Sequence, residues 1–339
     1  MKILVTGANG FIGGYLVAEL LQHGCDVVGL DNFSKYGRAA RSYDAHPHYR
    51  LVEGDAKDAA LLDRLLADCD HFVAGAARIG GITYFHKYAY DLLAENERIT
   101  AAAFDAAIRA HRAGRLKKIT VVSSSMVFEG ATTFPTPEGE QRRCPPPEST
   151  YGFQKLATEY FAQGARQQHG LPSTIVRPFN CVGVGESRAL GDADVRSGNV
   201  SLAMSHVVPD LVQKTLKGQD PLRILGDGSQ LRHYTYGGDL ARGIRIAIEH
   251  PAATNEDFNL STAAGTTVLD LAKLIWRKVR GDAPFRHVSD PPFEHDVRRR
   301  QPDVSKAKRI LGFEATTTLD AMLDEVIPWI DAQIKEGRI

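Results

Sequence analysis

The chain has 339 residues, enough for two domains with separate cores or for one extended α/β unit. Its 41 Lys and Arg balance its 41 Asp and Glu, so no overall charge favours nucleic acid or a membrane surface, and we expect neither as a partner. The four cysteines form no close pair, which predicts free thiols and no metal site. No stretch approaches the roughly 20 apolar residues of a membrane span, and no leader is recognised, so we expect a cytoplasmic protein.

Short apolar strands alternate with helices through the first half of the chain, which is typical of a parallel, doubly wound α/β sheet. We expect strands at 2–6, 26–30, 49–53, 71–74, 118–123 and 173–176, and helices at 10–23, 57–68, 84–111 and 151–169. After about residue 179 the pattern becomes irregular, with helices at 205–217, 239–249, 268–280 and 319–335. The sequence therefore predicts a Rossmann-type domain over 1–178, to which a strand near 258–260 returns. A smaller substrate-binding α/β domain is expected over most of 179–339.

A glycine-rich turn follows the first strand and opens the first helix. Gly7 suits the tight turn, Gly10 lets a pyrophosphate approach the backbone, and Gly13 lets the helix pack closely on the strand. Asp31 ends the second strand, where a carboxylate can accept from ribose hydroxyls and would repel a 2′-phosphate. The pattern predicts an NAD site. Asp31 also fits a simple turn with Asn32, and basic residues nearby weaken the preference for NAD over NADP.

A second pattern places Tyr151 and Lys155 four residues apart, on one face of a helix. A free phenol has a pKa near ~10. A nearby ammonium and a nicotinamide cation would lower that pKa, so that Tyr151 can take a hydroxyl proton while hydride leaves the same carbon. Ser123, Ser124 and Ser125 follow a strand and offer a hydroxyl to the reacting oxygen. Such a tyrosine–lysine pair also arises by chance, but together with the glycine turn and the serines it predicts catalysis.

With these motifs, the chain from residue 1 to about 313 resembles the extended short-chain dehydrogenase/reductase family. Within that family it is similar to the nucleotide-sugar epimerase branch, which contains the UDP-glucose and UDP-glucuronate 4-epimerases. Further matching stretches are V-A-G-A-A at 73–77, R-P-F-N at 177–180, G-D-G-S-Q-L-R at 226–232 and D-V-S-K-A-K at 303–308. The resemblance implies an NAD-dependent isomerase. It also implies a homodimer, formed through the helices that contain residues 100–113 and Tyr151.

The resemblance also implies the site residues, position by position. The catalytic residues would be Ser124, Tyr151 and Lys155. The cofactor would contact Gly7, Gly10, Phe11, Ile12, Gly13, Asp31, Asn32, Asp55, Ala56, Ala74, Ala76, Asn96, Tyr151, Lys155 and Pro178. The nucleotide-sugar would contact Gly80, Gly81, Ser124, Ser125, Met126, Tyr151, Asn180, Arg188, Arg232 and Arg300. Of these, Asn180 and Arg232 would hold the diphosphate.

The residues beside the catalytic serine discriminate between chemistries within the family. The 4,6-dehydratases resemble one another in T-D-E-V-Y-G and the UDP-glucuronate decarboxylases in T-S-E-V-Y-G, and both use acid groups there. Here the stretch reads S-S-M-V-F-E, so Met126 replaces the glutamate. A thioether cannot exchange protons, which favours a 4-epimerase acting on a UDP-hexose or UDP-hexuronic acid through a 4-keto intermediate. Phe128 and Glu129 replace the usual Tyr-Gly, and the sequence assigns Glu129 no role.

Other functions stay open at this point. The R-I-G-G-I stretch at 78–82 resembles the double-glycine stretches of GDP-fucose synthase and GDP-mannose 3,5-epimerase, so a 3,5-epimerase stays an alternative. Those enzymes use a cysteine as acid/base near the position of Met126, and Met126 cannot take that role. A nucleotide-ketosugar reductase would keep the same catalytic residues and consume NAD(P)H. A non-catalytic NAD-binding regulator would not need Tyr151 and Lys155 at this spacing. Arg300 matches an active-site arginine of the decarboxylases, and Arg188 stands where UDP-glucuronate 4-epimerases hold the sugar carboxylate. The triple arginine run at 298–300 also fits a solvated face.

Overall fold

The centre of the molecule is a seven-stranded, fully parallel sheet in the order β13-β6-β5-β4-β1-β2-β3. The structure is a computed structural model that describes residues 1–79, 88–186, 196–197, 200–201, 206–292 and 297–339. The strands are β1 (Lys2–Thr6), β2 (Asp26–Asp31), β3 (Tyr49–Glu53), β4 (His71–Ala74), β5 (Lys118–Val122), β6 (Ser173–Pro178) and β13 (Asp257–Leu260). The strand order reverses between β1 and β4, and ligands of such sheets bind at the carboxyl edge near this point.

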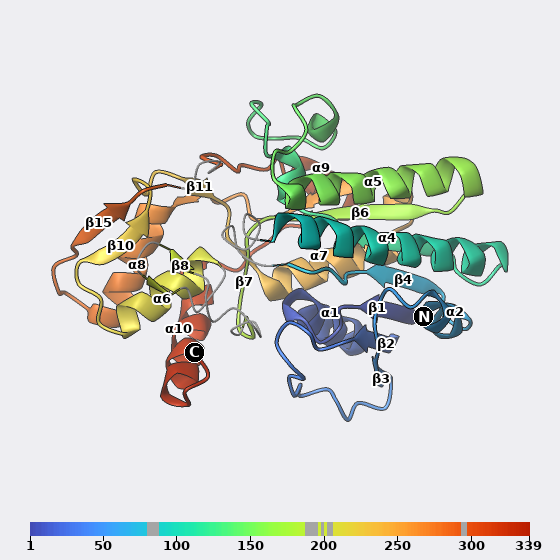
Figure 1. Ribbon diagram of the computed structural model, residues 1–339, viewed down its shortest axis with the longest axis horizontal. Coiled ribbons are helices and arrows are strands. Elements are labelled where there is room, and N and C mark those ends of the chain that lie inside the picture. The colour runs from blue at the N-terminus through green and yellow to red at the C-terminus, as the bar shows by residue number, and fades with distance from the viewer. Residues whose placement is uncertain (80–87, 187–195, 198–199, 202–205, 293–296) are drawn as a thin grey trace.

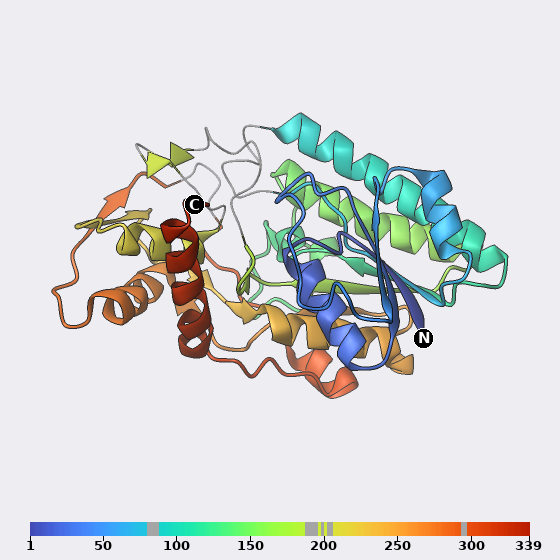
Figure 2. The ribbon, with the colours of Figure 1, turned by 90° about the horizontal axis from the view of Figure 1, so that it is seen from below.

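Helices cover both faces of this sheet (Figures 1 and 2). One face carries α2 (Ala59–Leu66), α4 (Ala89–Arg112) and α5 (Thr150–His169). The other carries α1 (Phe11–Gln22), α7 (Gly237–Glu249) and α9 (Ser305–Leu311). Because both faces are buried, the middle of the central strand β1 is apolar, and Ile3, Leu4 and Val5 have no exposed surface. The predicted α/β class with a Rossmann-type doubly wound sheet is confirmed.

A smaller lobe lies beyond the carboxyl edge of the sheet (Figure 1). Its core joins α6 (Val207–Leu216), α8 (Val268–Arg280) and α10 (Leu319–Lys335). Short strand pairs surround this core: β10 (Leu222–Leu225) with β15 (His287–Asp290), β11 (Leu231–Arg232) with β14 (Thr266–Thr267), β12 (Thr235–Tyr236) with β7 (Cys181–Val182), and β8 (Arg196–Ser197) with β9 (Val200–Ser201). Three elements that follow residue 179, namely α7, β13 and α9, lie on the large sheet rather than in this lobe.

Side-chain caps explain where the helices begin. The expected helix at 57–68 starts at Ala59, because the Asp58 carboxylate accepts a hydrogen bond from the backbone N–H of Leu61 at 2.9 Å. At the start of α9 the N-cap residue is Val304, and the preceding Asp303 carboxylate accepts from the N–H of Ser305 at 2.8 Å. The short strands of the smaller lobe and α9 itself were not predicted, because segments of so few residues show no measurable periodicity.

Three 3₁₀ turns complete the described structure: η1 (Ser125–Phe128), η2 (Glu140–Arg142) and η4 (Pro251–Ala253). All four cysteines are free thiols. Within the described ranges, no helix combines the length and the apolar character that crossing a bilayer requires. The same part of the chain contains no group of three or more His, Cys, Asp or Glu side chains arranged to hold a metal ion.

Candidate active site

The glycine turn between β1 and α1 has no room for side chains. Gly7 has φ +74°, a backbone conformation that L-residues other than glycine rarely adopt. A Cβ on Gly13 would lie 2.0 Å from the carbonyl oxygen of Gly7, so α1 packs directly on the turn. Gly10 precedes α1 and provides no side-chain cap. The first-turn N–H groups of α1 therefore suit a dinucleotide pyrophosphate, and this cradle fits NAD.

Asp31 lies beside this turn and is already bound to the backbone. One carboxylate oxygen accepts from the N–H of Asn9 at 3.0 Å, and the other accepts from the N–H of Phe33 at 2.8 Å. The second of these bonds forms the turn that includes Asn32. Each carboxylate oxygen retains a further acceptor position, so the predicted bond to the ribose remains compatible with this arrangement. Asp31 thus joins the glycine turn to the loop that follows β2.

The carboxyl end of β4 lies directly against the end of β1. The Thr6 hydroxyl accepts from the N–H groups of Gly75 and Ala76, both at 3.2 Å. Asn96 of α4 is 1% exposed; its amide accepts from the N–H of Arg78 at 2.7 Å and donates to the Arg78 carbonyl at 2.8 Å. Asn96 therefore holds the backbone that leaves β4, and its predicted contact with the cofactor remains a prediction. Gly80 and Gly81 lie outside the described residues.

The other predicted cofactor residues lie along the same carboxyl edge. Asp55 follows β3, and its carboxylate accepts from the N–H of Lys57 at 2.8 Å. Ala56 is buried, and Pro178 ends β6. The remaining positions belong to the start of α1 and the ends of β2 and β4, namely Phe11, Ile12, Asn32 and Ala74. Since the carboxyl ends of parallel strands meet at one edge, residues from separate segments come together there.

Ser124 and Tyr151 meet although they belong to different elements. Ser124 is the N-cap of η1, where its hydroxyl accepts from the N–H of Met126 at 3.2 Å, and Tyr151 lies in the first turn of α5. Burial raises the pKa of the Tyr151 phenol to about 12, whereas a hydrogen bond with Ser124 and the positive charge of Arg300 act to lower it. The two side chains thus form the hydrogen-bonded pair that general-base chemistry at a hydroxyl requires.

Lys155 lies one turn further along α5. Its Nζ donates to the carbonyl oxygen of Val122 at 2.9 Å and lies 6.0 Å from the centre of the Tyr151 ring. Burial lowers the pKa of the Lys155 ammonium to about 8, although the Glu159 carboxylate acts to raise it. The sequence predicts that the Lys155 ammonium acts on the phenol, and this stays a prediction. The structure adds a second cation, Arg300, whose charge acts on Tyr151.

The three consecutive arginines at 298–300 differ in exposure and in their neighbours. The segment runs beside β11: the N–H of Leu231 donates to the Arg298 carbonyl at 2.9 Å, and the N–H of Arg300 donates to the Leu231 carbonyl at 3.2 Å. Arg298 and Arg299 are exposed, as a solvated face requires. Arg300 is half-buried, and its charge acts on both Tyr151 and Tyr234. Only Arg300 of the three is therefore coupled to the phenol.

The other predicted substrate residues border the same region. Arg232 is buried, and its charge acts on Tyr234, as that of Arg300 does. Asn180 follows β6 with φ +38°, and its Nδ2 lies 3.5 Å from the His233 carbonyl oxygen. Met126 is buried against Tyr151 and Leu92, and Ser125 is buried in η1. Arg188 lies outside the described residues.

A buried ion network adjoins the serines, and sequence analysis missed it. Arg177 has no exposed surface; its Nε and Nη2 each donate to Glu159 at 2.7 Å, and Nη2 also lies 2.7 Å from Asp257. The Ser123 hydroxyl donates to the same Glu159 at 2.6 Å. Although burial acts to raise it, Arg177 and Lys306 hold the pKa of Asp257 at about 2. The available signal was Glu159 four residues after Lys155, on the same side of α5.

Comparison with known proteins agrees with this geometry. The model of the NAD dependent epimerase/dehydratase family matches residues 3–261. Over 93% of this chain and 92% of its own length, a UDP-glucose 4-epimerase of Lactobacillus helveticus is 26% identical. Over 97% of this chain and 76% of its own length, UDP-glucuronate 4-epimerase 3 of Arabidopsis thaliana is 27% identical.

Among solved structures, the UDP-glucuronic acid 4-epimerase of Bacillus cereus, in complex with UDP-glucuronic acid and NAD, superposes with a TM-score of 0.82. It is 26% identical, and the match covers 98% of this chain and 99% of that one. The chain belongs to the NAD-dependent epimerase/dehydratase family. The resemblance to the nucleotide-sugar epimerase branch, the isomerase class and the NAD cofactor are confirmed.

Proposed function

We propose that the protein is a nucleotide-sugar 4-epimerase that acts on a UDP-hexose or UDP-hexuronic acid through a transient 4-keto sugar. The observation that carries the proposal is the hydrogen-bonded pair of Ser124 and Tyr151, with Met126 packed against the tyrosine. Dehydration and decarboxylation need a proton-exchanging group at that position, and a thioether supplies none. Epimerisation at C4 needs only the base, the hydroxyl and the hydride carrier.

The proposed mechanism assigns one task to each side chain. Tyr151 takes the proton of the C4 hydroxyl, while Ser124 hydrogen-bonds the same oxygen. Bound NAD supplies the acceptor and later the donor of the C4 hydride. Asn180 and Arg232 hold the diphosphate while the 4-keto sugar turns about its link, so that its opposite face is presented. Tyr151 then returns the proton to the C4 oxygen of the epimer.

The position of Arg300 bears on the identity of the sugar. Its charge acts on the Tyr151 phenol, which contacts C4 in this mechanism, so Arg300 lies at the sugar end of the site. A guanidinium offers a planar set of donors that matches a carboxylate. A UDP-hexuronic acid would place its C6 carboxylate one carbon beyond the ring, near the reacting C4. This argument supports UDP-glucuronate, and UDP-glucose remains the alternative.

The test uses purified protein and a panel of nucleotide-sugars, followed by mass spectrometry and NMR. We expect the protein to carry NAD through purification and to form an isomer of unchanged mass without added cofactor. A product lighter by water or by carbon dioxide would refute the epimerase. A product two mass units heavier, formed only with added NAD(P)H, would establish the reductase instead.

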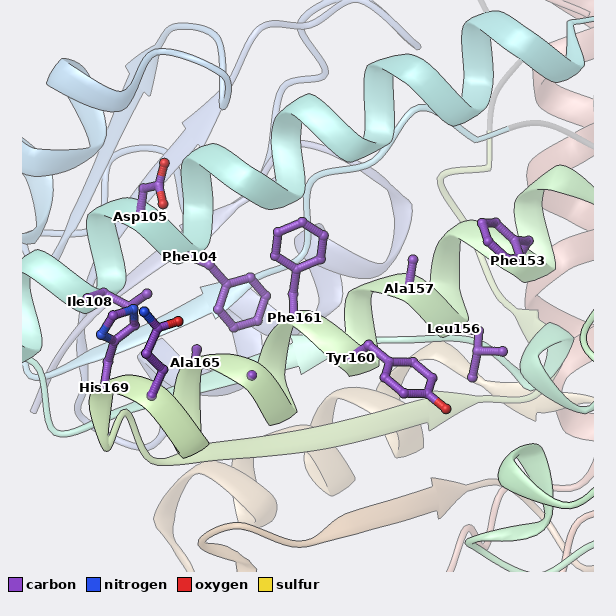
Figure 3. A pocket seen from close by; sticks show the side chains of 12 residues that line it. Phe104, Asp105, Ile108, Phe153, Leu156, Ala157, Tyr160, Phe161, Ala165 and His169 are labelled. Atoms are coloured by element: carbon purple, nitrogen blue, oxygen red, sulfur yellow. The ribbon is translucent and has the colours of Figure 1, made fainter.

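We also propose that two chains associate through the outer faces of α4 and α5. Three large apolar side chains of α5 are exposed there: Phe153 (48%), Tyr160 (56%) and Phe161 (37%). They border a hollow of about 620 Å³, and Phe161 stacks on Phe104 of α4 (Figure 3). This hollow is separate from the site around Tyr151. Exposed aromatic side chains gathered in this way are typical of protein interfaces.

The dimer is tested by light scattering during gel filtration. We expect a mass twice that of one chain, and a single-chain mass for the double variant Tyr160→Glu/Phe161→Glu, because two carboxylates would be buried without partners. A wild-type protein that elutes as a single chain at micromolar concentration would overturn this part of the proposal.

A further inference from the structure

Glu129 is the residue near the site that the sequence left without a role, and the fold gives it two contacts. It follows η1, and its Oε2 accepts from the backbone N–H of Ser149 at 3.1 Å and from the Ser149 hydroxyl at 2.7 Å. The two residues are 20 positions apart in the chain. One carboxylate oxygen thus connects the end of η1 to the residue that precedes α5, across the segment between them.

Ser149 links Glu129 to α5, the helix that contains Tyr151. It is the N-cap of α5, and its hydroxyl accepts from the N–H of Gly152 at 3.0 Å while donating to Glu129. The hydrogen bonds therefore run without interruption from Glu129 through Ser149 to the first turn of α5. Tyr151 lies in that turn, two residues after the cap.

The first turn of α5 also touches η1 directly. A Cβ on Gly152 would lie 2.8 Å from the Met126 carbonyl oxygen and 3.0 Å from Oε2 of Glu129. The distance to the Met126 carbonyl oxygen is too short for a Cβ, so Gly152 lets the two elements approach closely. The close approach of Gly152 to η1 therefore sets the distance between η1 and α5, and the bonds from Ser149 to Glu129 hold the two elements together there.

We propose that Glu129 is a positioning residue that holds Ser124 and Tyr151 in hydrogen-bonding register. Ser124 stands at the start of η1, Tyr151 stands in the first turn of α5, and Glu129 ties the end of η1 to the cap of α5. A shift of η1 against α5 would alter the distance between the two reactive hydroxyls. Proton transfer depends steeply on that distance. The effect on turnover rests on the proposed epimerase function, whereas the effect on the contact does not.

The competing explanation is an ordinary helix cap that contributes only stability. The two roles predict different kinetics. Loss of an ordinary cap lowers the free energy of unfolding and leaves the folded enzyme equally active. Loss of a positioning contact lowers kcat in the folded enzyme, while KM and the NAD content change little, because Glu129 touches neither the glycine turn nor the arginines around Tyr234.

The experiment compares Glu129→Ala and Glu129→Gln with Thr318→Ala. The Gln amide oxygen accepts both bonds from Ser149, so this variant should rescue the contact. Thr318 caps α10 in the smaller lobe, where its hydroxyl accepts from the N–H of Ala321 at 3.2 Å, and it serves as the matched cap control. We expect kcat to fall roughly 10- to 100-fold in Glu129→Ala, to stay within about three-fold of wild type in Glu129→Gln, and to be unchanged in Thr318→Ala. Activity is measured well below the unfolding temperature of each variant.

Amide hydrogen exchange of residues 124–153 provides a readout that needs no substrate. Exchange in this segment should rise in Glu129→Ala and should match wild type in Glu129→Gln and in Thr318→Ala. If Glu129→Ala keeps wild-type kcat, or if its exchange matches wild type, the positioning role is overturned. If wild type converts no sugar but the exchange differs as expected, the Glu129 contact between η1 and α5 stands, whereas the epimerase assignment fails and the positioning of Ser124 against Tyr151 for catalysis fails with it.

Discussion

The two halves of the candidate site are built in different ways. The cofactor half, formed by the turn at 7–13 and the ends of β2 and β4, relies on the backbone: glycines without space for a Cβ, and side chains such as Asp31 and Asn96 already bound to main-chain groups. The sugar half, formed by η1, β11 and residues 298–300, relies on charged and polar side chains such as Arg232 and Arg300. Substitutions should therefore disturb the first half by steric conflict and the second half by loss of charge.

Tyr151 stands between the two halves, and its removal should have the largest effect. Tyr151→Phe removes only the ionisable oxygen, so kcat should fall between about 100- and 10,000-fold. NAD content and thermal unfolding should stay close to wild type, because the ring still packs on Met126. Steady-state kinetics and release of bound cofactor check this. A variant within a few-fold of wild type would make Tyr151 an ordinary helix residue.

The cofactor half is tested with Gly13→Ala. The added Cβ would stand 2.0 Å from the Gly7 carbonyl oxygen, so the turn must move, with a loss of roughly 3 kcal/mol in the free energy of unfolding. NAD content after purification should fall with it. Gly114→Asn is the control, because Gly114 has φ +74° with no atom near its Cβ position and asparagine accepts that conformation. Equal NAD content in the two variants would contradict the steric account.

The sugar half is tested with Arg300→Ala, assayed with UDP-glucuronate and UDP-glucose. Loss of a charge-assisted bond to the carboxylate should reduce kcat/KM for UDP-glucuronate by about 2 kcal/mol, or roughly 30-fold. UDP-glucose lacks that carboxylate and should lose much less. The same measurements on Arg188→Ala show which arginine is responsible. Equal losses for both sugars would assign Arg300 to the phenol or the diphosphate, and the argument for a uronic acid would fail.

The opposite edge of the sheet should respond to pH through stability alone. His71 begins β4, and burial lowers the pKa of its imidazole to about 3, while its Nε2 lies 2.9 Å from the Thr120 hydroxyl. In the unfolded chain this pKa is about 6.5, so below that pH the unfolded state binds the proton first and stability is lost as pH falls. The loss should reach about 2 kcal/mol at pH 5. Denaturant unfolding at pH 7.5 and pH 5 measures it.

His71→Gln is the control for the pH prediction. The glutamine amide can reach the position of Nε2 and keep a hydrogen bond to Thr120, but it does not titrate in this range. The variant should lose about 2 kcal/mol less than wild type between the two pH values. If wild type and variant lose the same amount of stability, the titrating group lies elsewhere.

The parts of the site that sequence predicted are those that local pattern determines. Glycine spacing implies the turn at 7–13, and a four-residue spacing places Tyr151 and Lys155 on one side of α5. The order of strands and helices implied the sheet because apolar runs and helical periodicity are properties of short segments. The same local reasoning could not assign a role to Glu129, since its partner Ser149 is 20 residues away.

The sequence by itself determined the fold class, the glycine turn, the placing of Tyr151 and Lys155 on one side of a helix, and the presence of Met126 beside the serines, because each follows from neighbouring residues. Only the tertiary structure decided that Arg300 rather than Arg299 acts on Tyr151, because the pairing of residues 298–300 with β11 sets which side chain points inward. It also decided that the side chains of Asp31 and Asn96 hydrogen-bond to backbone groups, and that α7 and α9 pack on the large sheet. The return of β13 to that sheet agrees with the strand expected near 258–260. Such contacts depend on which distant segments of the chain meet in the fold, and patterns among neighbouring residues do not determine those meetings.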